Sequence, residues 1–134
     1  MHQVLGDENI FLFGLKAEEA AALSRHYDPK LRNDRDPVLR RVLDGIRDGF
    51  RDGVSYEAIY RRLLFGDNCP ADQYLLLADF VSYCDAGRRM IDTYGHRERW
   101  NQISLHNIAR SGGFAADRAI RDYARDIWHV PCKE

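Results

Sequence analysis

Residues 111–128 read SGGFAADRAIRDYARDIW, and this stretch decides the character of the C-terminal part of the chain. Residues 111–113 predict a turn, because glycine ends helices and adopts backbone conformations that other residues avoid. From about residue 116 to 128, apolar residues recur at steps of three and four, which predicts a helix with one apolar stripe. Pro131 is expected to stop this helix. The stripe consists of Ile120, Tyr123, Ala124, Ile127 and Trp128, and we expect it to be buried.

A second helix-forming pattern lies in the middle of the chain. Asp36 is expected to cap a helix with Pro37 at its first position, and Gly49 is expected to follow its end. The next helix is expected to begin at a Ser55 cap and to end before Gly66. The apolar face of the first of these two helices is predicted from Val38, Leu39, Val42, Leu43, Ile46 and Phe50.

The other helices are predicted at residues 16–23, at about 81–94 and at about 97–110, with a break at the sequence GHRE between the last two. Polar, proline-containing stretches at 27–36 and 67–72 predict loops. The side chains expected to point inward from the two long helices are Cys84, Met90, Ile91, Trp100, Ile103, Leu105 and Ile108.

Two apolar runs predict strands. Residues 9–15, NIFLFGL, show no polar alternation, which is typical of a strand that is buried on both faces. Residues 73–80, QYLLLADF, are interpreted as a second short strand or an extended segment. The expected fold class is therefore mainly α, with about six helices and one or two short strands. The length predicts one domain that covers residues 1–134.

The composition is that of a globular protein. Hydrophobic residues make up 45% and charged residues 31%, and the net charge is −1, which argues against electrostatic binding to nucleic acid or to an anionic membrane. The apolar runs are too short to span a bilayer, and the polar N-terminal residues give no sign of a signal peptide. Cys69, Cys84 and Cys132 are interpreted as reduced thiols of a cytoplasmic protein. The histidines and cysteines lack the paired spacing of a metal site.

A helix, a glycine turn and a second helix with arginines also suggest a helix-turn-helix DNA-binding protein. The arginines of the last helix alternate with aspartates, however, and two pairs stand four residues apart: Asp117 with Arg121, and Arg118 with Asp122. Such a face is expected to be ion-paired rather than to contact phosphates. The glycine turn is equally unlike a phosphate-binding loop, because it does not follow a strand and has no Walker lysine.

The sequence offers no catalytic, cofactor-binding or metal-binding residue that spacing alone would single out. No serine, histidine and acid stand in a known nucleophile motif. The lysines are Lys16, Lys30 and Lys133, and none has a glycine-rich context that would suggest an imine with a carbonyl compound.

The segment NIARSGGFAADRAIRDYARDIW resembles the C-terminal end of the glycogen and starch phosphorylases, whose pattern is I-A-x-S-G-x-F-S-S-D-R-x-I-x-x-Y-A-x-x-I-W. GDENIFLFGL, NDRDPVLRRVLDGIRDGF, LLLADF and RERW are similar to earlier motifs of the same family, in the family's order. Ala115 and Ala116 depart from the pattern, because the family often has serines there, so the last helix lacks its usual cap. The matching residues of the last motif are Ile108, Ala109, Ser111, Gly112, Phe114, Asp117, Arg118, Ile120, Tyr123, Ala124, Ile127 and Trp128.

The resemblance implies a role within a larger enzyme. It places the chain at the end of the second, Rossmann-like α/β domain of a glycosyltransferase type B fold, with the last helix packing across the domain junction. The full-length family uses pyridoxal phosphate to phosphorolyse α-1,4-glucan to glucose 1-phosphate. Its cofactor lysine lies in a G-T-G-N-M-K-F segment upstream of the strand, and this segment is not among the 134 residues. We therefore expect a structural segment without activity of its own and without a cofactor.

Two other hypotheses remain open, namely a stand-alone helical interaction module and, less favoured, a helix-turn-helix DNA binder. The expected partner is the upstream portion of a phosphorylase, or a second copy through residues 9–15, because an isolated strand has open edges. Nucleic acid and membrane are not expected partners, and the expected location is the cytoplasm.

Overall fold

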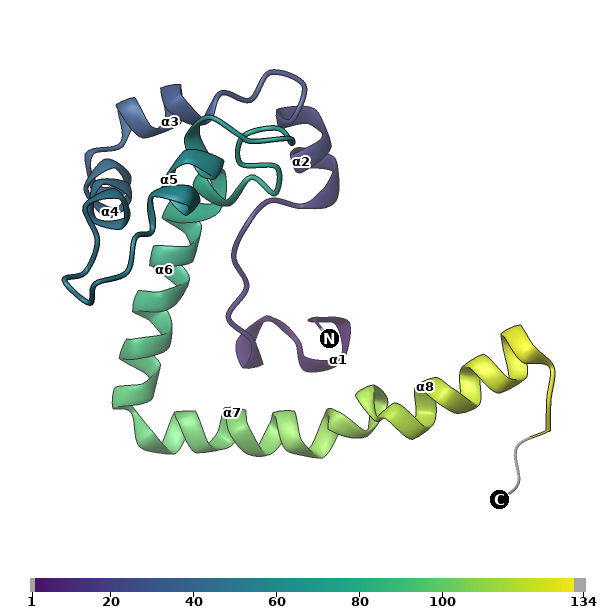
Figure 1. Cartoon of the computed structure of the whole chain (residues 1–134). Coiled ribbons are helices and arrows are strands. Elements are labelled where there is room, and N and C mark those ends of the chain that lie inside the picture. Colours follow the sequence, from purple (N-terminus) through teal and green to yellow (C-terminus); the bar gives the residue numbers. More distant parts are fainter. Residues whose placement is uncertain (1, 132–134) are drawn as a thin grey trace. The chain divides into compact units, whose positions relative to one another are not determined.

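The computed structural model describes residues 2–131, and these residues are mainly helical, as the sequence predicts (Figure 1). They fall into two compact units. We call Phe13–Ala86 the middle unit, and Met1–Leu12 together with Gly87–Glu134 the terminal unit. Helix α6 (Leu76–Gly95) contributes residues to both units.

The middle unit is built from four helices and the first part of α6. These are α2 (Ala17–Leu23), α3 (Pro29–Arg35), α4 (Pro37–Asp48) and α5 (Glu57–Leu64). Their small core contains the fully covered leucines of α4, α5 and α6, with four partly buried neighbours packed around them. The eight residues are Leu39, Leu43, Leu64 and Leu77, surrounded by Ile46, Tyr60, Leu63 and Phe80.

Two consecutive Asp-Pro pairs start α3 and α4. The Oδ1 atom of Asp36 accepts hydrogen bonds from Val38 N and Leu39 N at 2.9 and 3.0 Å, so the predicted cap is confirmed. Asp28 caps α3 in the same way, with Pro29 at the first helical position. The loop expected at residues 27–36 is therefore wrong: the polar composition of that stretch concealed a capped helix of seven residues.

The loop from Gly49 to Tyr56, which protrudes between α4 and α5 in Figure 1, contains three residues with positive φ. Gly49 and Gly53 adopt this conformation without a steric penalty, whereas Arg51 adopts it with a side chain. The Asp52 carboxylate accepts hydrogen bonds from Val54 N and from the Tyr56 hydroxyl. The Ser55 cap is wrong, since α5 begins at Glu57 after an N-cap that makes no side-chain hydrogen bond. The end of α5 before Gly66, at φ 74°, is confirmed.

Helix α6 begins at Leu76, so residues 73–80 do not form the strand or extended segment that their composition suggested. The reason lies in Asp72, which is only 3% exposed. Its carboxylate accepts hydrogen bonds from the first two amides of α6, Leu76 N at 2.8 Å and Leu77 N at 2.9 Å. An acceptor and a negative charge at this end favour a helix.

The strand predicted at residues 9–15 is also wrong, since no strand forms in the described part of the chain and no backbone–backbone hydrogen bond involves residues 10–15. Ile10 does have extended backbone angles, φ −145° and ψ 142°. A single strand has no ladder partner here, so side chains satisfy part of its backbone instead. In the middle unit, Gly14 N donates to Ser82 Oγ and Leu15 N donates to Asp79 Oδ1, both at 2.9 Å.

The terminal unit packs the N-terminal residues against α7 (Arg97–Arg110). These residues form α1 (His2–Leu5) and the turn η1 (Asp7–Asn9). Arg110 donates to the carbonyl of Val4, Arg99 to that of Glu8 and Asn107 to that of Asn9, at 2.6 to 2.9 Å. The break between the two long helices is confirmed, because α6 ends at Gly95 and α7 begins at Arg97.

The last part of the chain follows the predicted extent, with an unexpected final turn. After η2 (Ser111–Phe114), α8 (Ala116–Tyr123) continues into a π-helical turn, η3 (Ala124–Trp128). Ala115 stands at the N-cap of α8 without a side-chain hydrogen bond, as its alanine requires. The turn predicted at residues 111–113 is therefore confirmed.

Candidate docking surface

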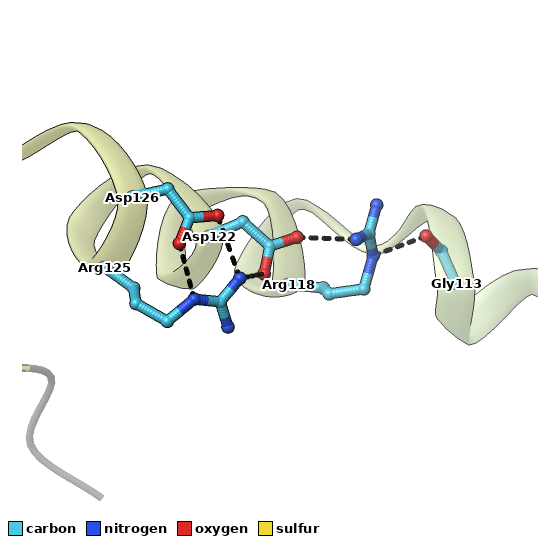
Figure 2. A network of polar contacts seen from close by, with 5 residues as sticks. All are labelled: Gly113, Arg118, Asp122, Arg125 and Asp126. Atoms are coloured by element: carbon cyan, nitrogen blue, oxygen red, sulfur yellow. Dashed lines mark hydrogen bonds and ion pairs between the residues drawn. The ribbon is translucent and has the colours of Figure 1, made fainter.

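The polar face of α8 carries a continuous chain of interactions (Figure 2). Arg118 Nε donates to the carbonyl of Gly113 at 2.6 Å, and Arg118 Nη1 donates to Asp122 at 2.6 Å. Arg125 then joins Asp122, at 2.9 Å, to Asp126, at 2.6 Å. Two of these arginines are therefore held against carboxylates of their own helix.

This arrangement disfavours a DNA-recognition helix. The Arg125 guanidinium hydrogen-bonded to it lowers the pKa of the Asp126 carboxyl, so the pair stays ionised and mutually neutralised. Of the two pairs predicted four residues apart, the structure forms Arg118–Asp122 but gives no ion pair between Asp117 and Arg121. Carboxylates distributed along the helix would repel phosphates.

The opposite, apolar stripe of α8 and η3 is left without cover. Trp128 is 56% exposed and Tyr123 is 49% exposed, and their ring centroids lie 6.1 Å apart, so they contact each other. The expectation that this stripe is buried is therefore wrong for this chain, with Ala124 as its buried member among the described residues. Among those residues, α8 has extensive contacts only with η2 and η3, and Figure 1 shows no other helix of the terminal unit beside it. We call Ile120, Tyr123, Ile127 and Trp128 the α8 stripe.

Several other predicted core positions are exposed as well. Met90 and Ile91 of α6, and Leu105 and Ile108 of α7, lie at the surface instead of pointing inward. In the terminal unit, Ile103 and Leu5 are buried, which explains how α1 holds α7. A soluble monomer rarely exposes so many large apolar side chains, and such surfaces mark contacts with another molecule or segment.

The described residues show no catalytic arrangement. No group of three or more histidines, cysteines, aspartates or glutamates among them is placed to hold a metal ion. Cys69 and Cys84 are free thiols, and Cys132 lies outside the described residues. None of the helices in residues 2–131 has the length and apolar character needed to cross a bilayer.

The lysines do not fit a pyridoxal phosphate site. The ammonium group of Lys30 lies 4.4 Å from the centroid of the Phe65 ring, which it contacts as a cation over an aromatic face. Lys16 is the N-cap residue of α2, and its amide donates to Glu19 at 2.8 Å. Lys133 lies outside the described residues. Since neither described lysine stands in an enclosed site, we derive no chemical step through this cofactor.

The family model of the carbohydrate phosphorylases matches residues 1–130. The chain belongs to this family. It is 40% identical over 136 residues to a glycogen phosphorylase of Chlamydia pneumoniae, covering 99% of this chain and 16% of that protein. The corresponding protein of Bacillus subtilis is 38% identical over 94% of this chain, and the human liver form is 32% identical over 97% of it. The chain spans 16% and 15% of the length of these two phosphorylases.

Two features of this phosphorylase-family chain could not be found from motifs. The Tyr27 hydroxyl donates to Asp72 at 2.6 Å, although the two residues are 45 positions apart in a stretch predicted as loops. Burial and this hydrogen bond to the carboxylate raise the pKa of Tyr27. The second feature is Tyr74, which follows closely and is the most exposed of the large apolar side chains, at 74%. The Asp-Pro cap of α3 was a usable signal for the first feature, and no periodic pattern indicated the second.

Proposed function

We propose that this chain is the C-terminal segment of an α-glucan phosphorylase and that it is structural, without catalytic activity of its own. The observation that carries the proposal is the α8 stripe, an amphipathic helix face that packs on nothing within the described residues. The similarity to glycogen phosphorylases over nearly the whole chain supports the same role. In this proposal the partner is the upstream portion of the enzyme, and the helices complete a Rossmann-like domain of a type B glycosyltransferase.

The energetics of covering the stripe favour such docking. Complete burial of a large apolar side chain is worth roughly 1.5–3 kcal/mol. Each of the four stripe residues is about half exposed, so covering them contributes roughly 1 kcal/mol each, or about 4 kcal/mol together. The ion-paired opposite face, held by Arg118 and Arg125, orients α8 so that its polar side remains in water.

The proposed parent reaction is phosphorolysis of α-1,4-glucan to glucose 1-phosphate, with pyridoxal phosphate supplied by the upstream portion. This chain would contribute contacts that stabilise the domain rather than groups that touch the substrate. A cytoplasmic location, as for an enzyme of intracellular glucan, is part of the same proposal.

Complementation tests this function directly. The Chlamydia pneumoniae relative, shortened by the region that this chain matches, is mixed with the chain, and glucose 1-phosphate formation from glycogen is measured. We expect activity only when both parts are present. Trp128→Ala should lower the restored activity by at least about 5-fold, whereas Arg121→Ala on the same helix should leave it unchanged. Glucose 1-phosphate formation by the chain alone, or failure of the two parts to associate, would contradict the proposal.

Self-association through residues 9–15 is a second candidate, and one observation favours it. Leu12, Phe13 and Leu15 remain partly exposed, and the backbone of this segment makes no ladder. A second copy could pair with it as a symmetric dimer. Light scattering at micromolar concentration, compared between the chain and a Phe13→Asp variant, distinguishes the two candidates. A stable dimer lost in the variant supports self-association, and a monomer that still complements the shortened enzyme excludes it.

Two alternatives predict other behaviour. A stand-alone helical interaction module would bind a protein unrelated to glucan metabolism. A helix-turn-helix protein would bind duplex DNA in a salt-dependent way, which the paired arginines of α8 disfavour.

A further inference from the structure

We propose that Tyr74 and the slot beside it form a surface binding site for an α-1,4-glucan chain, an inference that rests on the proposed function. The slot lies in the middle unit between α5 and the start of α6 and measures about 210 Å³. This is below the roughly 300–1,000 Å³ of pockets that enclose a drug-sized ligand, which fits a shallow contact with one sugar ring. Its apolar walls come from Ile59, Leu63, Pro70 and Leu76.

The ring of Tyr74 is presented to solvent by a firmly anchored turn. Leu75 is buried beside it, and Leu75 N donates to the carbonyl of Asp72 at 2.8 Å. Asp72 and Leu75 both have positive φ, 42° and 58°, although neither is glycine. Such conformations cost free energy and persist where the surrounding structure holds them. The buried Asp72 carboxylate, with its three hydrogen bonds, provides that anchor.

The polar rim of the slot has unused hydrogen-bonding groups. The side chains of Arg62 and Gln73 line it, are exposed, and make no hydrogen bond or ion pair with the other described residues. A guanidinium offers five donors, and an amide offers two donors and an acceptor. Asp72, in contrast, is fully occupied by its helix and by Tyr27.

A glucosyl unit matches this combination of an apolar floor, an exposed ring and a polar rim. Its faces carry C–H groups that stack on an aromatic ring, and its edges carry hydroxyl groups that need donors and acceptors. A protein partner would satisfy the apolar walls of the slot but would leave Arg62 and Gln73 to be desolvated, which costs free energy unless they are paired. The unpaired rim therefore favours the glucan.

Native electrophoresis in gels cast with and without glycogen tests the site on the intact chain. We expect glycogen to retard the chain and maltoheptaose to relieve the retardation. Tyr74→Ala should weaken binding about 10-fold, and Tyr74→Phe, which keeps the ring, should stay within about 2-fold. Tyr83→Ala is the matched control, because Tyr83 is 57% exposed on α6 and does not line the slot.

Thermal unfolding of each variant checks that the exposed positions leave the fold intact. No retardation of the unsubstituted chain, equal binding by Tyr74→Ala, or an equal loss in Tyr83→Ala would overturn the proposal. So would a Tyr74→Ala chain that binds glycogen normally but no longer complements the shortened enzyme, since Tyr74 would then contact protein. Complementation needs no glycogen binding by the isolated chain, so failure of this site leaves the proposed function standing.

Discussion

Replacing Asp72 by alanine should destabilise the middle unit by about 3–5 kcal/mol. The side chain is buried and satisfies three donors, which are two amides of α6 and the Tyr27 hydroxyl. Loss of an acceptor at a helix N-terminus costs about 1 kcal/mol. Each buried donor left without a partner costs roughly 1–3 kcal/mol more. The two φ-positive residues of the turn would also lose the contact that holds them.

Urea unfolding followed by circular dichroism measures this effect, and a double-mutant cycle isolates its Tyr27 component. Tyr27→Phe removes the hydroxyl but leaves the two amide bonds, so we expect a smaller loss of about 1–2 kcal/mol. In the Asp72→Ala background the same substitution should cost almost nothing, which corresponds to a coupling of about 1–2 kcal/mol. A loss below about 1 kcal/mol for Asp72→Ala, or no coupling with Tyr27→Phe, would show that the turn is held by other contacts.

The other predictions concern single positions. The folded pKa of Tyr27 lies above its ordinary value of about 10, so its contribution to stability should be complete below pH 10 and be lost as the pH rises further, a decline that Tyr27→Phe should reduce in urea titrations at several pH values. Gly66→Ala should cost at least about 1–2 kcal/mol in urea unfolding, because φ is 74° and the new Cβ would lie 2.5 Å from Cys69 O. Gly87→Ala, inside α6 with open space around it, should instead stabilise by about 0.5–1 kcal/mol. Trp128→Ala should cost only about 1 kcal/mol in the isolated chain, since the side chain is more than half exposed, and unfolding at a much lower urea concentration would show that the indole has found cover.

Local chemistry explains which helices the sequence could predict. Asp36 with Pro37 at the start of α4, and Gly66 after α5, act within one turn of their own position, so their effect is visible without a structure. Asp28 with Pro29 carries the same signal, and it was overlooked because the stretch around it is polar. The two predicted strands failed for a different reason. A strand requires a partner that sequence position cannot supply, whereas Asp72 starts a helix through bonds only four and five residues away.

Burial was the property that sequence patterns predicted least well. The apolar periodicity of α8 is real, but periodicity only states that a face is apolar and not what covers it. Leu39 and Leu43 of α4 find cover against α5 and α6, while the equally apolar Val38 and Val42 remain exposed. The family resemblance was found from motifs such as SGGF and DRAI, which act over the whole chain and need no packing information.

The loop between α4 and α5 has a practical consequence for engineering. Its backbone at Gly49, Arg51 and Gly53 is exposed and turns through conformations that no helix contact enforces. The ordering bonds of the loop begin at Asp52, which holds Val54 and Tyr56. A peptide inserted after Arg51 therefore lengthens a connection that is already solvent-exposed, and each doubling of loop length costs only about 0.6 kcal/mol in closure entropy. An affinity tag placed there would leave both ends of the chain, and the whole of α8, unaltered for binding measurements.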